Sequence, residues 1–401
     1  MNLNKYWNEV GENKTVGLKQ LCCGCDTCSQ VCPKAAISVE KDSMGFYYPI
    51  IDEDKCVHCG ICVRRCQCLS NKFFIKTKRQ PEAYAVVNRD LKSLKDSSSG
   101  GAAFVLAMYI LEQQGVVFGA VYNETMDIVH QKIESREELW RIQGSKYAQS
   151  RIHNSYQQVE EYLKNGKKVL FTGTPCQIGG LYFFLGKDYP ELYTMDIICY
   201  GAASPGIFKD YIEWKENKTK GKIKHINFRN KLDGWGNSIT EITYYNKKIL
   251  LRYSEQDEWY QTFISHVATR EACHYCKYTN LQRLSDITVG DFWGIEKFRP
   301  EMECGRGISK VLVNTDKGKR LFESISNGIK KEKMEFESIV RPNLVQPPPR
   351  SECREKFLED YCRLGFYPAF KNNVEKKIPF IRQMKRYLKI IIRSKVASEK
   401  W

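Results

Sequence analysis

The sequence contains no apolar run long enough to cross a membrane. Its longest apolar stretch, residues 102–111, ends at a Glu-Gln-Gln-Gly segment, well short of the roughly 20 residues that span a bilayer. Residues 1–17 mix charged and polar side chains without an apolar run, so we expect no secretion signal. These absences predict a cytoplasmic protein.

Low-complexity tracts are absent too, and the only internal repeat is a doubled cysteine motif. Hydrophobic residues make up 42% and aromatic residues 12% of the chain, more than a disordered chain contains. Its 401 residues predict two to three domains at about 150 residues each. The 63 Lys+Arg exceed the 47 Asp+Glu, for a formal net charge of +16. We therefore expect a folded protein with a basic surface.

Cysteine, by contrast, is abundant. The chain has 17 cysteines, and ten of them lie between Cys22 and Cys68. The other seven are spread over the rest of the chain, where they would cross-link little of it. Because no secretion signal is expected, a disulfide framework is disfavoured. The cysteines therefore predict metal or cluster ligation.

Within the dense segment one spacing occurs twice, as Cys22-x2-Cys25-x2-Cys28-x3-Cys32-Pro33 and as Cys56-x2-Cys59-x2-Cys62-x3-Cys66. The spacing is that of bacterial two-cluster 4Fe-4S ferredoxins, in which the fourth cysteine of each run ligates the other cluster. A pair of zinc sites is the alternative, although structural zinc uses paired Cys-x2-Cys knuckles. Two further thiols, Cys23 and Cys68, are expected to pack rather than ligate. We predict one 4Fe-4S cluster on Cys22, Cys25, Cys28 and Cys66, and a second on Cys56, Cys59, Cys62 and Cys32.

Strand-like and helix-like segments alternate after the cysteine-rich region. Inside that region, residues 36–40 and 45–51 are predicted strands of a small hairpin, and residues 71–81 are a predicted linker or entry loop. Further strands are predicted at 83–87, 116–122 and 168–171, and helices after 101 and at 159–165 and 178–185. Residues 223–253 have a β-like pattern around a turn at 246–247. This order predicts mixed α/β layers.

Two turns carry small or hydroxyl residues suited to a phosphate-bearing ligand. Residues 98–101 open a predicted helix, where free backbone N–H groups and small side chains admit a phosphate; an ordinary serine-rich N-cap is the alternative. Residues 172–177 follow a predicted strand, at the edge where open α/β sheets bind ligands, and a plain strand-to-helix turn is the alternative there. The candidate residues are Ser98, Ser99, Gly100, Gly101, Thr172, Gly173, Thr174, Pro175 and Gln177.

Six motifs occur in order along the later part of the chain. They are Ser98-Ser99-Gly100-Gly101, Gly144-Ser145-Lys146-Tyr147, Gly173-Thr174-Pro175-Cys176-Gln177, Asp196-Ile197-Ile198-Cys199, Cys273-x2-Cys276 and Ser285-Asp286-Ile287-Thr288-Val289-Gly290-Asp291-Phe292-Trp293-Gly294. Together they resemble the beta-subunit family of coenzyme F-420 hydrogenases and dehydrogenases, over about residues 82–345. The resemblance implies an FAD-bearing iron–sulfur oxidoreductase. Relatives of this kind include 7-hydroxymethyl chlorophyll reductases and deazaflavin-linked dehydrogenase and sulfite reductase subunits.

The resemblance also implies a domain layout and a flavin site. The expected fold class is α+β and α/β in several domains: a small bacterial-type two-cluster ferredoxin domain at 1–75, a mixed α/β flavin-binding domain with an N-terminal part at 82–160 and a C-terminal part at 161–345, and a basic helical tail at 346–401. The turns at 98–101 and 172–177 are expected to contact the flavin or its pyrophosphate. Lys146 would place a positive charge near the phosphate or the flavin ring; a solvated surface lysine is the alternative.

Four later cysteines are candidates for a third cluster. The family resemblance suggests a 4Fe-4S cluster near the flavin, with Cys176, Cys199, Cys273 and Cys276 as its ligands. Cys304 could replace one of them, and a zinc ion at Cys273 and Cys276 is the alternative. The family usually has histidine after the cysteine that matches Cys199, whereas this chain has Tyr200.

The C-terminal tail is strongly basic. Residues 371–401 carry ten Lys+Arg against two Glu, and apolar residues recur at helical spacing over 380–391 with basic residues between them. This pattern predicts a basic amphipathic helix. Over 379–396 such a helix could make peripheral contact with anionic lipid at the inner face of the membrane, or dock on an acidic partner. Packing of its apolar side on the protein's own core is the alternative.

These features together predict an iron–sulfur flavoprotein oxidoreductase. Clusters carry one electron at a time whereas organic substrates usually take a pair, and a flavin connects the two modes. The chain would relay electrons between its clusters and FAD, to or from an organic substrate or a deazaflavin coenzyme, with a redox protein as donor or acceptor. The alternatives are a non-catalytic electron-transfer subunit serving a partner enzyme and a zinc-stabilised interaction protein. No nucleic-acid module is visible, so no nucleic-acid partner is expected, and the sequence assigns neither a catalytic residue nor an oligomeric state.

Overall fold

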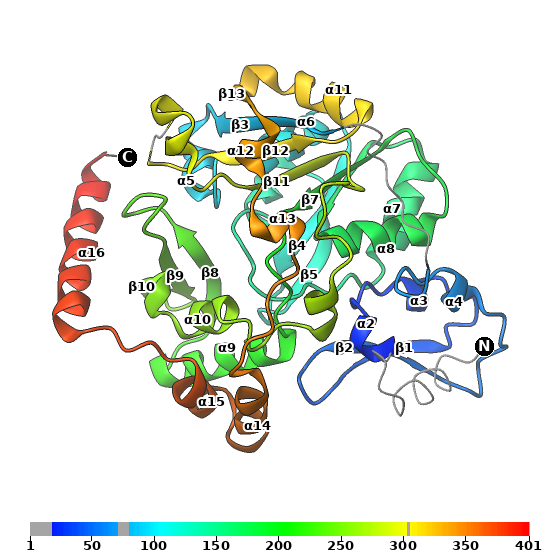
Figure 1. Ribbon diagram of the computed structural model, residues 1–401, viewed down its shortest axis with the longest axis horizontal. Coiled ribbons are helices and arrows are strands. Elements are labelled where there is room, and N and C mark those ends of the chain that lie inside the picture. The colour runs from blue at the N-terminus through cyan, green and yellow to red at the C-terminus, as the bar shows by residue number, and fades with distance from the viewer. Residues whose placement is uncertain (1–17, 71–79, 303–304, 401) are drawn as a thin grey trace.

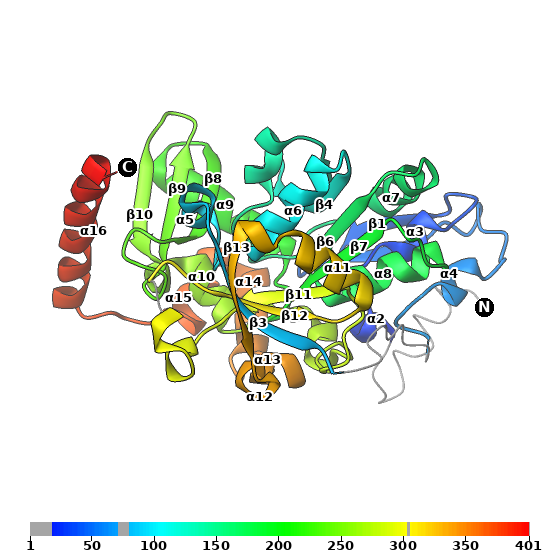
Figure 2. The same cartoon turned by 90° about the horizontal axis from the view of Figure 1, so that it is seen from above.

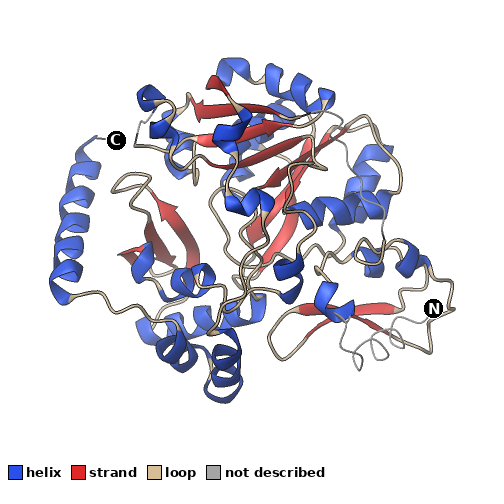
Figure 3. Ribbon diagram, viewed as in Figure 1, coloured by secondary structure: helices blue, strands red, loops and turns tan. Residues whose placement is uncertain are grey.

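Eight strands form the large mixed sheet at the centre of the molecule (Figures 1 and 3). The computed structural model describes residues 18–70, 80–302 and 305–400, so most of the predicted linker, and Cys304, lie outside the described residues. The order across the sheet is β13-β3-β12-β11-β7-β6-β4-β5. Its strands are β3 (Glu82–Asn88), β4 (Val116–Tyr122), β5 (Ile128–Ile133), β6 (Val169–Gly173), β7 (Leu192–Ile197), β11 (Ile287–Asp291), β12 (Ser309–Val313) and β13 (Ile329–Met334).

Parallel pairing is confined to the middle of this sheet. β4, β6, β7 and β11 are parallel neighbours, whereas β5, β12, β3 and β13 pair antiparallel. Parallel strands need crossover connections, which place helices on both faces. α6 (Ala102–Glu112) and α11 (Asp316–Ser324) cover one face, and α7 (Ser155–Lys164) and α8 (Pro175–Leu185) cover the other. The parallel strands therefore end at one common edge, here called the carboxyl edge, where open α/β sheets bind ligands.

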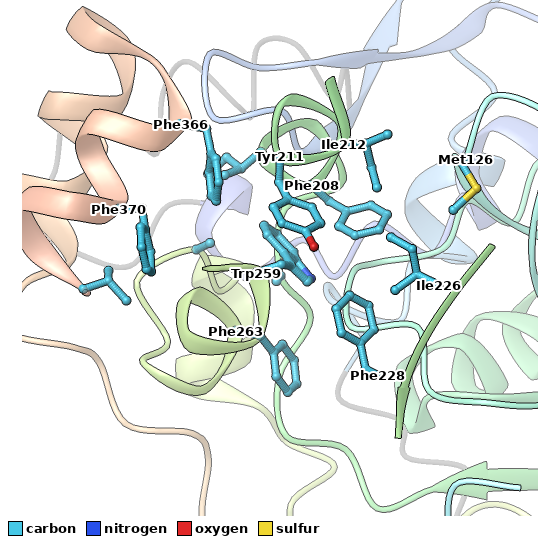
Figure 4. Packing of buried hydrophobic residues seen from close by; sticks show 14 of the residues in the cluster. Met126, Phe208, Tyr211, Ile212, Ile226, Phe228, Trp259, Phe263, Phe366 and Phe370 are labelled. Carbon is cyan, nitrogen blue, oxygen red and sulfur yellow. The ribbon is translucent and has the colours of Figure 1, made fainter. Parts of the chain in front are cut away.

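A small antiparallel sheet stands beside the large one. Its strands are β8 (Ile223–Asn230), β9 (Ile239–Tyr244) and β10 (Ile249–Tyr253), so the β-like pattern of residues 223–253 forms a sheet of its own. Four helices adjoin it: α9 (Pro205–Thr219), α10 (Glu258–Ile264), α14 (Arg354–Leu364) and α15 (Phe366–Asn373). Phe208, Tyr211, Phe228 and Trp259 are buried in the core that joins these elements (Figure 4).

The cysteine-rich segment forms a module at one end of the molecule (Figure 1). Its elements are α2 (Leu18–Leu21), α3 (Thr27–Gln30), β1 (Ile37–Lys41), β2 (Tyr47–Ile51) and α4 (Ile61–Arg64). The doubled motif is repeated in the backbone, because Gly24 and Asp26 of the first run and the equivalent His58 and Gly60 of the second all have left-handed φ angles. A non-glycine residue in this conformation costs of order 1–3 kcal/mol. The fold therefore imposes the same tight turn on both cysteine runs.

The C-terminal helix α16 (Phe380–Lys400) lies at the opposite end, beside β10 (Figures 1 and 2). Its basic side faces the protein, since Arg386 pairs with Glu255 and Lys389 Nζ lies 2.8 Å from Asp233 Oδ2. Its other side exposes apolar residues, among them Phe380, which is 74% exposed. Ile390 packs beside Ile239 and Tyr253, so the alternative in which the apolar side packs on the protein's own core holds for this residue but not for the exposed ones. No helix among the described residues is long and apolar enough to cross a membrane.

Predicted and observed helix starts differ at α8 and α7. The sequence predicts a turn over 172–177 and a helix from 178, whereas the helix already begins at Pro175. Thr174 is its N-cap and forms a capping box with Gln177, whose Oε1 accepts from the Thr174 backbone N–H at 3.0 Å. Proline suits the first helical position because its φ is already helical. α7 likewise begins at Ser155, so the predicted division between residues 160 and 161 falls inside a helix. The remaining short helices are α5 (Leu91–Asp96), α12 (Phe336–Ile339) and α13 (Pro342–Val345).

Candidate functional site

Each predicted set of four N-terminal cysteines lines one cavity. Cys22, Cys25, Cys28 and Cys66 line the first cavity, together with Cys62 and Cys68. Cys32, Cys56, Cys59 and Cys62 line the second. The fourth cysteine of each run thus lies at the cavity of the other run, which is the exchange that two-cluster ferredoxins make. The donor set of each cavity fits a 4Fe-4S cluster.

The two cavities differ in their access to solvent. In the second cavity Cys59 is exposed, and the apolar side chains of Ile37 and Ile51 pack on the cysteines behind it. In the first cavity burial raises the pKa of the Cys22 thiol to about 12. Cys59 of the second cavity therefore meets solvent, whereas the four cysteines assigned to the first cavity are half-buried.

The first cavity lies against helix α8. Thr27 Oγ1 donates to the Gly180 carbonyl at 3.0 Å. A Cβ at Gly180 would come within 2.8 Å of the Cys25 Cβ, and a Cβ at Gly179 within 2.4 Å of Gln67 Oε1. Glycine in a helix interior costs about 1 kcal/mol relative to alanine. This close approach of the module explains why two glycines occur in succession in α8.

The four later cysteines gather on the other side of this contact. Cys176 is in the first turn of α8, Cys199 lies just after β7, and Cys273 and Cys276 lie after α10. Burial raises the pKa of the Cys199 thiol, and nearby Cys273, Cys176 and Cys276 raise it further. The structure therefore brings together the four cysteines that the sequence analysis grouped.

Cys23 and Cys68 lie between the first cavity and this later group. Cys68 Sγ lies 3.7 Å from Cys23 Sγ. The pKa of Cys23 is raised first by its hydrogen bond to Cys176 and then by those to Cys25 and Cys68. Cysteine side chains thus continue without a break from the first cavity to Cys176, the first residue of the later group.

A buried arginine, which the sequence analysis missed, holds this junction. Arg270 is fully buried, and its Nε donates to the Cys22 carbonyl at 2.6 Å and its Nη2 to the Tyr47 carbonyl at 2.8 Å. Burial lowers the pKa of Arg270, but Tyr48, Cys22 and Cys273 raise it, with a net rise. The guanidinium therefore stays charged between the two cysteine groups. No local motif marks Arg270, because its partners come from segments far apart in the sequence.

The spacing of these groups differs from that of a single-ion site. Among the described residues, no three Cys, His, Asp or Glu side chains converge closely enough to hold one metal ion. A zinc site needs such convergence, at Zn–S distances of about 2.3 Å. In a 4Fe-4S cluster each of the four thiolates binds a different iron, so the sulfurs stand further apart.

The turn at 98–101 lies where β3, β12 and α6 meet. A Cβ at Gly100 would come within 2.2 Å of the Val86 carbonyl oxygen and 2.3 Å of the Ser309 nitrogen. Gly101, with a φ of 78°, is the N-cap of α6. Both glycines are thus required by the backbone itself, which leaves the two serines as the side chains of this turn that can meet a ligand.

These serines adjoin a pair of tryptophans. Ser98 Oγ lies 2.9 Å from Ser145 Oγ, and the Ser98 carbonyl accepts from Trp235 Nε1 at 3.2 Å. The Trp235 ring stacks on the Trp293 ring, with 3.9 Å between centroids and 5° between planes. Trp293 is 44% exposed and follows β11 at the carboxyl edge. The pair offers an aromatic face on which a ligand ring can stack.

The turn at 172–177 positions Cys176. Thr172 Oγ1 donates to the Phe118 carbonyl at 2.9 Å, and Gln177 Nε2 donates to Ser150 Oγ at 2.9 Å. Gly173 ends β6, Thr174 caps α8 and Pro175 starts it. These contacts fix the beginning of the helix, and with it the cysteine in its first turn.

Lys146 folds back on its own loop. Its Nζ donates to the carbonyls of Arg141 at 2.8 Å, Gln143 at 2.7 Å and Gly144 at 3.4 Å. Burial lowers its pKa to about 7. The side chain is therefore not the solvated lysine of the alternative interpretation, and it ties down the loop that carries Ser145.

A histidine lies next to Tyr200 although the local sequence has none there. The His266 ring lies 4.5 Å from the Tyr200 ring, and within the described part of the chain its Nε2 has no hydrogen-bond partner. His266 follows α10, so an imidazole reaches the vicinity of Cys199 from a different segment.

Residues 166–341 match the family described as the C terminus of the coenzyme F420 hydrogenase/dehydrogenase beta subunit. A chain of the F420-reducing NiFe hydrogenase complex from Methanosarcina barkeri aligns with a TM-score of 0.43 and 16% sequence identity, covering 75% of this chain and 93% of that chain. No curated protein matches.

The matched segment runs from just before β6 to α12 and the residues after it. It includes the cysteine group of Cys176, Cys199, Cys273 and Cys276 and the motif at 285–294. Over this segment the chain is similar to the C-terminal part of the coenzyme F420 hydrogenase/dehydrogenase beta subunit family.

Proposed function

We propose that the chain is an iron–sulfur flavoprotein oxidoreductase. It relays electrons between 4Fe-4S clusters and FAD, to or from an organic substrate or a deazaflavin coenzyme. The observation that carries this proposal is the succession of three groups of four cysteines, from the exposed end of the module to the carboxyl edge of the large sheet.

The residues assigned to the clusters follow the three groups. Each cluster would carry one electron at a time, and the flavin would exchange electron pairs with an organic molecule. The proposed ligand sets are Cys32, Cys56, Cys59 and Cys62; Cys22, Cys25, Cys28 and Cys66; and Cys176, Cys199, Cys273 and Cys276.

Arg270 supports this arrangement by its charge. A ligated cluster with four thiolates is negatively charged, and a fixed cation between two such groups lowers their mutual repulsion. Its hydrogen bonds to the Cys22 and Tyr47 carbonyls also hold the module on the rest of the protein.

The flavin is assigned to the carboxyl edge, beside the 98–101 turn. Ser98, Ser99 and the Trp235–Trp293 pair would contact it. Lys146 and the turn at 172–177 would support this site, by holding Ser145 in place and by fixing Cys176.

A redox partner protein would approach the exposed end of the module. Cys59 is exposed and Val57 is 57% exposed, and both belong to the loop around the second cavity. An electron donor or acceptor docking on this loop would reach the second cluster without displacing any other element.

The proposal is tested on the full chain purified without oxygen. We expect a brown protein with both iron–sulfur and flavin absorbance, which bleaches on reduction by dithionite. A preparation that contains zinc but neither iron nor flavin would contradict the proposal and support an interaction protein instead.

A second candidate is a non-catalytic electron-transfer subunit, favoured by the family description as a beta subunit. Measuring turnover with the isolated chain distinguishes an enzyme from an electron-transfer subunit. An enzyme would reduce a deazaflavin or another organic acceptor catalytically with a viologen as donor. A transfer subunit would be reduced once and would turn over only with its partner enzyme.

We also propose that α16 makes peripheral contact with anionic lipid over 379–396. The apolar side of the helix points away from the protein, and the tail around it is rich in lysine and arginine. Helices of this kind lie in the plane of a bilayer surface with their apolar side inward.

A further inference from the structure

Arg229 is a buried cation with an unused hydrogen-bonding edge. Its side chain is 7% exposed, and its Nη1 donates to Asp291 Oδ2 at 2.8 Å. Its Nε and Nη2 have no partner among the residues that the structure describes. These two N–H groups form one edge of the guanidinium, the kind of edge that binds two oxygens of a carboxylate or a phosphate. Because buried donors are nearly always paired in folded proteins, this edge calls for an acceptor from beyond the described residues.

The backbone directs Arg229 toward the carboxyl edge. The pairing of β8 with β9 shifts register between Asn227 and Asn230, and Arg229 lies within this bulge. Bulges re-aim side chains and are common next to active sites. Here the side chain reaches from the small sheet to Asp291, the last residue of β11 in the large sheet.

The charges around Asp291 favour an anion. Burial and the nearby Arg341 lower the pKa of Lys310 and Asp291 opposes them, so that the pKa lies at about 8 and Lys310 remains protonated at neutral pH. Arg229 and Lys310 therefore both lie near the Asp291 carboxylate, and a third cation, Arg341, lies near Lys310. Their net positive charge attracts a negatively charged ligand.

Aromatic rings flank the same guanidinium. Arg229 Cζ lies 5.2 Å from the centre of the Trp293 ring, and Nη1 lies 3.5 Å from the Tyr147 hydroxyl. Trp293 stacks on Trp235, which is hydrogen-bonded to the turn at 98–101. A ligand ring on the tryptophan face would therefore have the guanidinium close by.

We propose that Arg229 anchors an oxyanion subsite, in which Nε and Nη2 bind the carboxylate or phosphate of a ligand that stacks on Trp293. The subsite rests on the proposed function only in treating that ligand as cofactor or substrate. Two sources supply this chemistry: the phosphate of the flavin, and an acidic group of the organic substrate.

Binding measurements on the full chain test the subsite and separate the two sources. FAD, riboflavin and citrate are titrated into the full chain after its flavin has been removed, while tryptophan fluorescence is recorded. Arg229→Gln should weaken binding of the anchored probe about tenfold to hundredfold, as loss of hydrogen bonds to a charged group does. Arg229→Lys should also weaken it, since lysine keeps the charge but lacks the planar edge.

Lys248→Gln is the matched control, because Lys248 is an exposed cation in the turn that joins β9 and β10 of the small sheet. It should bind every probe as the wild type does. If Arg229→Gln binds only FAD more weakly, the oxyanion is the flavin phosphate. If it binds only citrate more weakly, the oxyanion belongs to the substrate. Unchanged binding of all probes by Arg229→Gln, or a wild type that binds none of them, would overturn the subsite.

Thermal unfolding with and without the anchored probe provides a second readout. Arg229→Gln should unfold below Lys248→Gln without ligand, because it also loses the buried ion pair with Asp291. Added probe should raise the midpoint of Lys248→Gln but not that of Arg229→Gln, and an equal rise in both variants would overturn the proposal. Iron and flavin counted on the same preparations test the proposed function separately, so a cluster-containing chain without oxyanion binding would refute the subsite alone.

Discussion

At the residue scale, buried polar groups fix the carboxyl edge of the large sheet. His130 Nε2 lies 2.9 Å from the Thr172 carbonyl, and its Nδ1 lies 3.0 Å from Ser150 Oγ. Gln177 Nε2 donates to the same hydroxyl. Burial lowers the pKa of His130 from 6.5 to about 4. The neutral imidazole thus ties β5 to the end of β6 and the start of α8.

Because the pKa of His130 is low in the folded state, we expect the free energy of unfolding to fall in mild acid. The unfolded chain takes up a proton near pH 6.5 and the folded chain only near pH 4, so stability falls as the pH drops from 6.5 to 4. The difference between the two pKa values corresponds to about 3 kcal/mol. We expect the thermal midpoint of the wild type to fall more steeply over this window than that of His130→Gln. Parallel pH profiles of the two proteins would contradict this account.

The close packing around Gly100 leads us to expect that a side chain there would destabilise the protein. A Cβ there would collide with backbone atoms of β3 and β12, and overpacking of this kind typically costs about 1–3 kcal/mol. Gly100→Ala should lower the free energy of unfolding in denaturant by about this much. Gly236→Ala is the control, because a Cβ at Gly236 meets nothing within 4 Å. Equal stability of the two variants would show that strand packing does not explain Gly100.

At the element scale, local patterns are predictable from the sequence and long-range pairs are not. The cysteine spacing predicts which cysteines share a cavity, because each run folds into one tight turn. The apolar runs predict strands of the large sheet for the same local reason. The early start of α8 escapes prediction because Pro175 is typical of turns as well as of first helical positions, although Thr174 and Gln177 have the spacing of a capping box.

Several site residues have no local signal at all. Arg270 reaches Cys22 across most of the chain, and Arg229 reaches Asp291 from another sheet. The stacking of Trp235 on Trp293 likewise joins two segments that no motif connects. Such contacts follow from the way the elements pack, which the sequence pattern does not encode.

We expect helix α16 to bind the full chain to anionic lipid vesicles. With its apolar side outward, it should bring the full chain to the top of a gradient with vesicles that contain phosphatidylglycerol. Replacing Phe380, Ile381 and Leu388 by serine should abolish flotation without changing the thermal midpoint, because all three side chains are exposed. Flotation that persists in the triple variant, or is absent in the wild type, would argue against lipid contact.

At the scale of the whole molecule, the three cysteine groups form one path. It leads from exposed Cys59 through the first cavity to Cys199 at the carboxyl edge. α16 lies at the far end from this path (Figure 1). A redox partner on the module and a surface contact through α16 would therefore not compete for space.

The path predicts the effect of removing a single thiolate. Cys273→Ser should lose about four iron atoms per chain, the content of one 4Fe-4S cluster, and keep the iron of the two N-terminal clusters. Cys353→Ser is the control, since Cys353 is exposed and distant in sequence from every group. An iron content unchanged by Cys273→Ser would remove the third cluster from the account.

The most direct measurement is the iron and acid-labile sulfide content of the wild-type chain, purified without oxygen. Three clusters predict about twelve iron and twelve sulfide per chain. Bound zinc with no iron or sulfide would contradict the central claim that these cysteines hold redox clusters.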